Sequence, residues 1–144
     1  MATGDEESGQ ASRDLQFDHG TLCVGDVEAA IEFYGRVLGL QQIERPDFGF
    51  PGAWFMAGSI PIHLTTGGLL RGANAPLNSY EAHLAFRMEK DLQHLVEKVR
   101  AAGAPVYESE DPPVAQRQIF ILDPWGNMLE FCQYGPELPV DTGN

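Results

Sequence analysis

The 144-residue sequence has few cysteines, few basic residues and no long apolar run. Its only two cysteines, Cys23 and Cys132, lie far apart and outside any Cys-x-x-Cys pair, which argues against a disulfide scaffold and against a thiolate zinc site. No apolar run is long enough to span a bilayer, and the acidic N-terminus lacks the basic and apolar regions of a secretory signal. We therefore expect a cytoplasmic protein with reduced thiols.

Basic side chains are scarce relative to acidic ones, 9 against 21, and the formal net charge is -12. This balance disfavours nucleic acid and anionic membranes as partners. Hydrophobic residues make up 43% of the chain, enough to build the core of one domain. We expect residues 1–14 to be a disordered acidic tail, residues 15–136 to form the domain, and residues 137–144 to be a flexible C-terminus.

A weak internal repeat with an offset of about 64 residues divides the domain into two units, about 15–66 and 80–135. In each unit a short β-prone run begins with a histidine and is followed by an Asp placed to cap a helix and a Gly placed to end it. Further β-prone segments follow each helix. The matching positions are His19 and His83, Asp26 and Asp91, and Gly39 and Gly103. Each unit is therefore predicted to be βαβββ, and the fold class α+β.

Both predicted helices have one apolar face. The apolar positions are Val27, Ala30, Ile31, Tyr34 and Leu38 in the first unit, and Leu92, Leu95, Val96 and Val99 in the second. His94 lies off this stripe, so we expect it to face solvent. The predicted later strands are 41–44, 53–57, 61–65, 106–108, 118–122 and 128–133.

Each unit offers one candidate metal ligand from its first strand and one from its fourth. The four are His19 and His63 in the first unit, and His83 and Glu130 in the second. If the two sheets form one curved surface, these groups can converge on a metal ion. Two imidazoles and one carboxylate suit Fe(II), while Zn, Mn, Co and Ni are also admissible, so the ligands do not choose the metal.

Structural roles compete with each of these interpretations. A lone histidine in a strand is more often hydrogen-bonded than metal-bound, and Glu130 could be a solvent-facing carboxylate. Both cysteines are expected to be small core hydrophobes. Arg117 could bind an anionic substrate group, although a solvated surface arginine is commoner. Four aromatic residues could line an apolar substrate wall, although we expect most of them in the core; they are Phe48, Phe50, Trp54 and Phe55.

Three motifs connect this chain to a known family. They are His19-x-Thr-Leu-x-Val-x-Asp26 with the helix that follows, His83-Leu-Ala-Phe86, and Asp123-Pro-x-Gly-x-x-x-Glu130. On these residues the sequence resembles the vicinal oxygen chelate superfamily of glyoxalases, bleomycin resistance proteins and extradiol dioxygenases, from about Phe17 to Tyr134. The resemblance implies two βαβββ units in a half-open barrel around one metal. The family equivalents of His19, His83 and Glu130 bind a divalent metal, which substrates chelate through adjacent oxygens.

The resemblance predicts a metal-dependent, glyoxalase-like lyase or isomerase acting on a small molecule, with His63 or Glu130 as the base. His63 stands where glyoxalase I has a glutamate, which removes one negative charge from the site. The resemblance also implies a homodimer. The sequence is compatible with a site formed by both units of one chain and with a site shared between two chains.

Three other functions are open within the same family. An Fe(II) extradiol dioxygenase and a fosfomycin-type thiol transferase both use a two-histidine, one-glutamate set, which His19, His83 and Glu130 match. Thr21 resembles a substrate-contacting threonine of the fosfomycin enzymes, and with Trp54 and Arg117 it completes our candidate substrate residues. The third alternative is a metal-free binding protein of the bleomycin-resistance kind, although such proteins generally lack the full ligand set.

Overall fold

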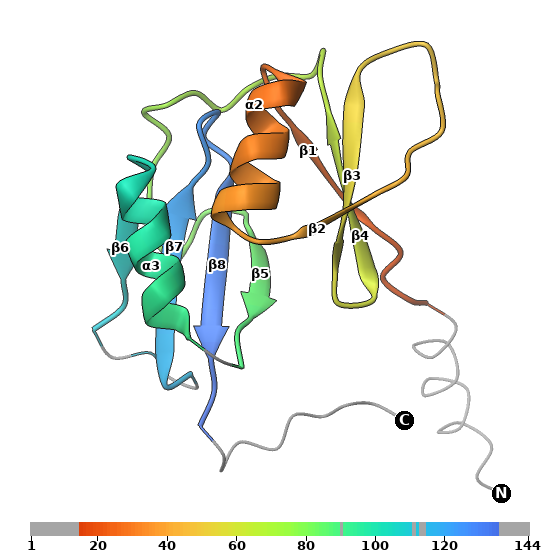
Figure 1. Ribbon diagram of the computed structural model, residues 1–144. Helices are drawn as coiled ribbons and strands as arrows, with labels where there is room; N and C mark the ends of the chain where they lie inside the picture. The colour runs from red at the N-terminus through yellow and green to blue at the C-terminus, as the bar shows by residue number, and fades with distance from the viewer. Residues whose placement is uncertain (1–14, 90, 111, 113–114, 136–144) are drawn as a thin grey trace, which may run out of the picture.

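The computed structural model describes residues 15–89, 91–110, 112 and 115–135. The predicted acidic tail and C-terminal segment lie outside these residues. Two four-stranded sheets, one from each predicted unit, carry the fold, and the helices lie between and beside them (Figure 1). None of the helices in this part of the chain combines the length and the apolar character needed to cross a membrane.

The first sheet comes from the first unit and has the order β1-β4-β3-β2, with β1 parallel to β4 and the other pairs antiparallel. Helix α2 and the π-helix η1, which directly continues it, follow β1 in the chain. The elements are β1 (Gly20–Cys23), α2 (Val27–Ile31), η1 (Glu32–Val37), β2 (Gln41–Ile43), β3 (Gly52–Ala57) and β4 (Ile60–Thr65).

The second sheet repeats this topology with the order β5-β8-β7-β6, again with its first and fourth strands parallel. Its elements are β5 (Leu84–Arg87), α3 (Leu92–Ala101), β6 (Val106–Glu108), β7 (Arg117–Leu122) and β8 (Met128–Gln133). The predicted βαβββ repeat and the α+β class are confirmed. The two sheets are separate and do not close into a barrel.

The helix boundaries agree with the predicted signals. Asp26 and Asp91 each accept a hydrogen bond from the backbone N–H three residues later, at 2.7 and 3.2 Å. Gly39 and Gly103 follow the helical segments with φ of 81° each, in the left-handed region that glycine adopts without strain. His94 is exposed, as predicted.

The first helix differs from the regular α-helix that the sequence predicted. Its second half is a π-helix, in which the N–H of Leu38 donates to the carbonyl of Phe33, five residues earlier, at 3.0 Å. The wider turn brings two consecutive residues, Phe33 and Tyr34, into the core. The predicted apolar stripe included Tyr34 and omitted Phe33.

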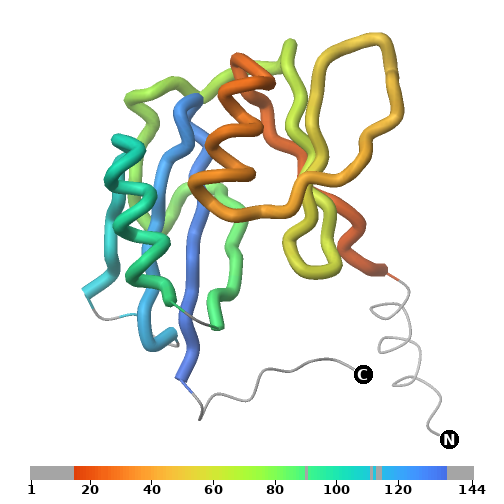
Figure 2. Tube along the Cα trace, viewed as in Figure 1, coloured from red at the N-terminus to blue at the C-terminus, as the bar shows by residue number. Residues whose placement is uncertain are grey.

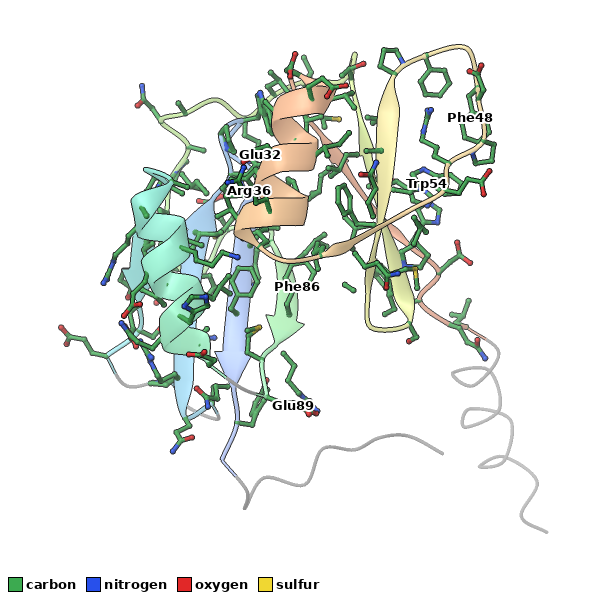
Figure 3. The ribbon with its side chains drawn as sticks, viewed as in Figure 1. Glu32, Arg36, Phe48, Trp54, Phe86 and Glu89 are labelled. Atoms are coloured by element: carbon green, nitrogen blue, oxygen red, sulfur yellow. The ribbon has the colours of Figure 1, made fainter. Side chains whose placement is uncertain are left out.

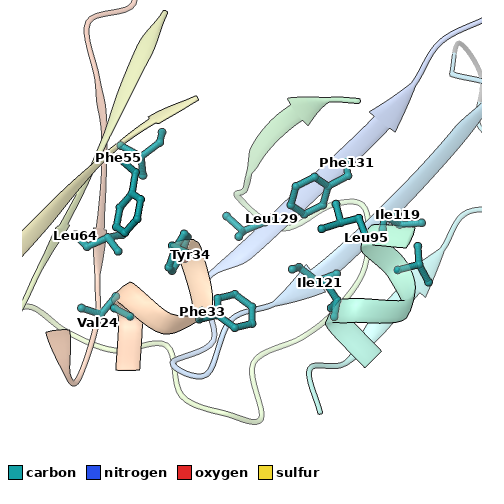
Figure 4. Close-up of a cluster of buried hydrophobic side chains, with 14 of the residues drawn as sticks. Val24, Phe33, Tyr34, Phe55, Leu64, Leu95, Ile119, Ile121, Leu129 and Phe131 are labelled. Carbon is teal, nitrogen blue, oxygen red and sulfur yellow. The ribbon is translucent and has the colours of Figure 1, made fainter. Parts of the chain in front are cut away.

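One hydrophobic core joins the two units (Figure 4). Phe55 of the first sheet and Leu129 of the second belong to the same buried cluster, which also contains Phe33 and Tyr34 of η1. The hydroxyl of Tyr34 donates to Asp123 of the second unit at 2.7 Å. The helix of the first unit therefore lies between the two sheets. We call the side of each sheet that lies opposite this core its outward face.

Candidate functional site

The predicted fourth-strand ligands lie on the two outward faces. His63 on β4 is paired in register with Thr21 on β1 and with Trp54 on β3. Glu130 on β8 is paired with Phe120 on β7. Cross-strand partners share a face of a sheet, and the core-facing residues are those one position away along each strand. Each outward face thus presents one predicted ligand at its centre.

In the second unit, His83 and Glu130 lie in direct contact. The Nε2 atom of His83 is 2.7 Å from Oε2 of Glu130, a residue that is only 6% exposed. The other ring nitrogen of His83, Nδ1, lies 2.6 Å from the carbonyl oxygen of Glu81. Many metal-binding histidines donate one ring N–H to a backbone carbonyl and direct the other nitrogen at the cation, and His83 has the first of these contacts. His83 and Glu130 are therefore prearranged as neighbouring donors.

Two further residues hold the second oxygen of Glu130. Gln118 Nε2 donates to Oε1 at 2.5 Å, and the thiol of Cys132 donates to the same oxygen at 2.7 Å. Burial, together with this bond to Glu130, raises the pKa of the Cys132 thiol to about 12, so it stays protonated and keeps its donor. The sequence interpretation missed both roles. The register of the hairpin, which places Gln118 opposite Cys132, was the available signal.

In the first unit, the ring of His63 lies between two others. Its centroid is 4.1 Å from that of Trp54 and 4.2 Å from that of His19, both in stacked geometry. Nδ1 of His19 lies 2.6 Å from the Asp18 carboxylate. Loss of hydration, and then the nearby His19, lower the pKa of His63. Its imidazole is therefore neutral at pH 7 and able to accept a proton.

The two pairs do not meet within one chain. Among the described residues, no three His, Cys, Asp or Glu side chains are close enough together to hold a metal ion. The shared core lies between the outward faces, so His19 and His63 are separated from His83 and Glu130. The expected convergence of all four groups around one metal is thus not formed by a single copy, because the units pack through their helical sides.

The predicted substrate residues fall in different places. Thr21 and Trp54 flank His63 on the outward face of the first sheet. Arg117 precedes Gln118 by one position on β7, so it points from the opposite side of the second sheet. Its guanidinium binds Glu108 through two hydrogen bonds of 2.7 and 3.1 Å. The geometry brings Thr21 and Trp54 to a candidate ligand and gives no such support to Arg117.

The four aromatic candidates also divide. Phe55 is fully buried in the core, as expected, whereas Phe48 and Phe50 are 51% and 53% exposed, so a core role is wrong for these two. The reason is that the loop between β2 and β3 extends beyond the edge of the sheet (Figure 2). Figure 3 shows Phe48 and Trp54 on the same side of the molecule, away from helix α2.

The loop that connects the two units covers part of the second outward face. Ala75 and Leu77 of this loop pack against a small cluster formed by Phe120, Leu122 and Met128. Glu130 thus lies beside an apolar, covered region. No such cluster accompanies His63 in the described part of the first sheet, which leaves the first outward face more open.

The amino-acid sequence is similar to that of one protein family and of two plant proteins. The model of the Glyoxalase/Bleomycin resistance protein/Dioxygenase superfamily matches residues 16–131. "Glyoxylase I 4" of Arabidopsis thaliana is 28% identical, over 94% of this chain and 79% of its own length. "Lactoylglutathione lyase GLX1" of the same plant is 29% identical over 84% of this chain, which spans 45% of that relative.

Solved structures of similar fold include a glyoxalase family protein from Bacillus anthracis, with a TM-score of 0.69, 23% identity and coverage of 84% of this chain and 96% of that one. A mutant of the fosfomycin resistance protein FosX from Listeria monocytogenes has a TM-score of 0.69, 19% identity and coverage of 85% and 94%. That protein was solved with Mn(II) and 1S,2S-dihydroxypropylphosphonic acid. These likenesses confirm the fold.

Proposed function

Because the chain belongs to the Glyoxalase/Bleomycin resistance protein/Dioxygenase superfamily, we propose that it is a divalent-metal-dependent lyase or isomerase whose small substrate binds through vicinal oxygens. The observation that carries this proposal is the contact between His83 and the buried carboxylate of Glu130. A carboxylate withdrawn from water needs a cation or hydrogen bonds to remain charged. Gln118 and Cys132 satisfy one of its oxygens, and the other faces the nitrogen of His83.

The donor set fits a divalent metal. His19, His63, His83 and Glu130 would supply three imidazole nitrogens and one carboxylate oxygen, a set that Zn, Ni, Co, Mn and Fe all accept. When bound, such a metal would polarise the vicinal oxygens of the substrate and acidify an adjacent group. With one carboxylate in this set, the site carries less negative charge than one that uses two.

His63 is the proposed base, with Glu130 as the alternative. Its pKa is lowered, so the imidazole is neutral near pH 7 and can take a proton from the substrate. The stacked rings of Trp54 and His19 restrict its orientation. Thr21 on β1 is paired in register with His63 and has a hydroxyl that can hydrogen-bond to a substrate oxygen.

We further propose that two copies of the chain assemble each site. β1 and β5 are edge strands, each bonded to one neighbouring strand among those described. His19 immediately precedes β1 and His83 immediately precedes β5. Edge strands have unpaired backbone groups that can pair with another chain. In a homodimer, His19 and His63 of one copy would face His83 and Glu130 of the other, and the site would be incomplete without both.

Metal content tests the proposal. Wild type, His83→Ala and His94→Ala would be purified together and analysed for Zn, Ni, Co, Mn and Fe. His94 is an exposed helical histidine and serves as the matched control. We expect about one metal per chain in wild type and in His94→Ala, and loss of that metal in His83→Ala.

Two results would replace this proposal. Iron in the wild type, together with oxygen uptake in the presence of a catechol, would identify an extradiol dioxygenase. No bound metal, even after incubation with divalent ions, would leave the metal-free binding protein as the better description.

A further inference from the structure

A continuous row of five aromatic rings crosses the outward face of the first sheet and ends on the exposed loop between β2 and β3. The rings follow in the order His19, His63, Trp54, Phe48 and Phe50, with successive centroids 4.2, 4.1, 6.0 and 5.8 Å apart. The row thus connects two candidate metal ligands with two half-exposed phenylalanines. A ligand bound at the two histidines could therefore extend along Trp54 and contact the two phenylalanines.

A cation lies at the far end of this row. The guanidinium carbon of Arg45 is 4.9 Å from the ring centroid of Phe48 and 5.0 Å from that of Phe50. Its Nη1 donates to the carbonyl of Phe50 at 3.1 Å. No carboxylate of the described residues forms an ion pair with Arg45. Because arginine carries five N–H donors, this one retains donors for an anion.

The backbone of β3 leaves space for this arginine. A Cβ atom added at Gly52 would lie 2.8 Å from Nε and 2.9 Å from Cζ of Arg45. Gly52 has no left-handed φ, so its backbone tolerates alanine, and the guanidinium would have to move. The absence of a side chain at Gly52 therefore allows the observed position of Arg45.

We propose that Arg45, Phe48 and Phe50 form an anion-and-aromatic subsite that binds an acidic aromatic end of the substrate, a carboxylate carried by an aromatic ring. The ring would pack on the exposed surfaces of Phe48 and Phe50, and the carboxylate would accept hydrogen bonds from Arg45. The position of the opposite, oxygen-chelating end rests on the function proposed above. The substrate class is thus an aromatic acid with vicinal oxygens.

Three features favour this occupant over a merely solvated loop. Two large aromatic side chains are half exposed at adjoining positions, which costs hydration free energy unless something covers them. A cation without a described carboxylate partner lies over both rings in a chain of net charge -12. The same surface continues to His63 through Trp54. A neutral apolar partner would account for the phenylalanines and not for the unpaired cation.

The first experiment needs no metal. The full-length, metal-free protein would be titrated with phenylacetate, with 2-phenylethanol and with acetate, while the indole N–H signal of Trp54 is followed by NMR. We expect phenylacetate to bind about tenfold more tightly than either of the other probes. Arg45→Gln and Gly52→Ala should both remove this preference. Arg36→Gln, which alters an exposed helical arginine paired with Glu32, should leave it unchanged.

A second experiment separates the subsite from the metal site. With Zn(II), 3,4-dihydroxyphenylacetate and 4-ethylcatechol both present vicinal oxygens, and the first alone is an acid. We expect Arg45→Gln to weaken binding of the acid about tenfold and to leave the neutral probe unchanged. His83→Ala should weaken both.

The outcomes distinguish the two proposals. Phenylacetate binding that depends on Arg45, in a protein that binds no metal, would support the subsite and overturn the metal-dependent function. Zinc-dependent binding of both catechols, with no difference between wild type and Arg45→Gln, would do the reverse. A Phe48→Ala/Phe50→Ala variant that loses its dimer in sedimentation and keeps phenylacetate binding would assign the two rings to a subunit interface and overturn the subsite.

Discussion

The two outward faces come from two repeats of the βαβββ unit and present different chemistry. On the second sheet, Glu130 is buried, bonded by two donors on one oxygen and in contact with His83 on the other. On the first sheet, His63 occupies the corresponding place among stacked rings, with no carboxylate bonded to it in the described residues. One face is closed and charge-compensated, and the other is open and aromatic.

This difference fits separate roles for the two repeats in the proposed function. The buried carboxylate with fixed neighbours is suited to anchoring a cation, because its geometry is set before the cation arrives. The open face has the His63 imidazole at its centre and an aromatic surface beside it, which fits the proposed contact with a substrate. In the proposed function, one repeat would therefore anchor the metal and the other repeat would contact the substrate.

The largest expected effect comes from mixing two inactive variants. His19→Ala and His83→Ala should each lack activity. Refolded together in equal amounts, they should recover about one quarter of wild-type activity, because about half of the dimers would be mixed and each mixed dimer would contain one intact site of its two. Turnover assays on the mixture would measure this. Activity that stays absent after demonstrated subunit exchange would place all four ligands in one chain.

Exchanging the two central residues for glutamine should separate their roles. Glu130→Gln is expected to lose bound metal and activity together. His63→Gln should lower kcat by about 10²–10⁴-fold while metal remains on the three other ligands, because a positioned base contributes that much. Metal analysis beside steady-state kinetics tests both. Unchanged kcat in His63→Gln would transfer the role of base to Glu130.

Removing one support of Glu130 should have a smaller effect. Gln118→Leu takes away one of the two donors on Oε1 of Glu130 and is expected to weaken metal binding by about 10–100-fold, the usual cost of losing a group that orients a ligand. Competition with a chelator would measure the affinity. Gln116→Leu changes an exposed neighbour and is the control. Equal affinities in the two variants would show that Cys132 and packing suffice to hold Glu130.

The link between the two halves can be weakened without touching either face. Tyr34→Phe removes the buried hydrogen bond from Tyr34 to Asp123 and should lower the free energy of unfolding by about 1–2 kcal/mol. Urea unfolding would measure this, with the exposed Tyr80→Phe as control. A single transition in every variant is expected, since one core joins both units. Two separate transitions would show that the halves unfold independently.

The smallest effect concerns alkaline pH. Burial, and then the neighbouring Asp123, raise the pKa of Tyr34 well above its ordinary value of 10.0. Its stabilising contribution is therefore fully present below about pH 10 and is lost as the pH rises beyond that value, because the unfolded chain releases the proton first. Urea titrations at about pH 8 and about pH 10.5 should show a smaller loss in Tyr34→Phe than in wild type. Equal losses would assign the alkaline sensitivity to other groups.

Most of the fold could be predicted from local signals. The β-prone segments placed the strands within one or two residues, and the caps at Asp26 and Asp91 with the glycines after both helices marked the helix ends. The π-helix was missed, and with it the burial of Phe33 beside Tyr34 in the core that joins the two sheets. A local period contains no information about that packing.

The candidate site divides in the same way. The strand boundaries were enough to place His63 and Glu130 within the fourth strand of each unit, whereas only the structure puts the two residues on separate outward faces. The contacts of Gln118 and Cys132 with Glu130 depend on hairpin register, and the exposure of Phe48 and Phe50 depends on the path of a loop. These follow from interactions between strands and could not be assigned from single segments.

By itself, the sequence determined the repeated βαβββ unit, the helix ends and the four candidate ligands, because turns, caps and periodicity act over a few neighbouring residues. Only the tertiary structure decided how the two units meet. Packing of the η1 helix between both sheets, and the bond from Tyr34 to Asp123 across 89 residues, direct the outward faces away from the shared core. The ligand pairs are thereby kept apart in one chain, since burial of apolar surface favours joining the helical sides of the units.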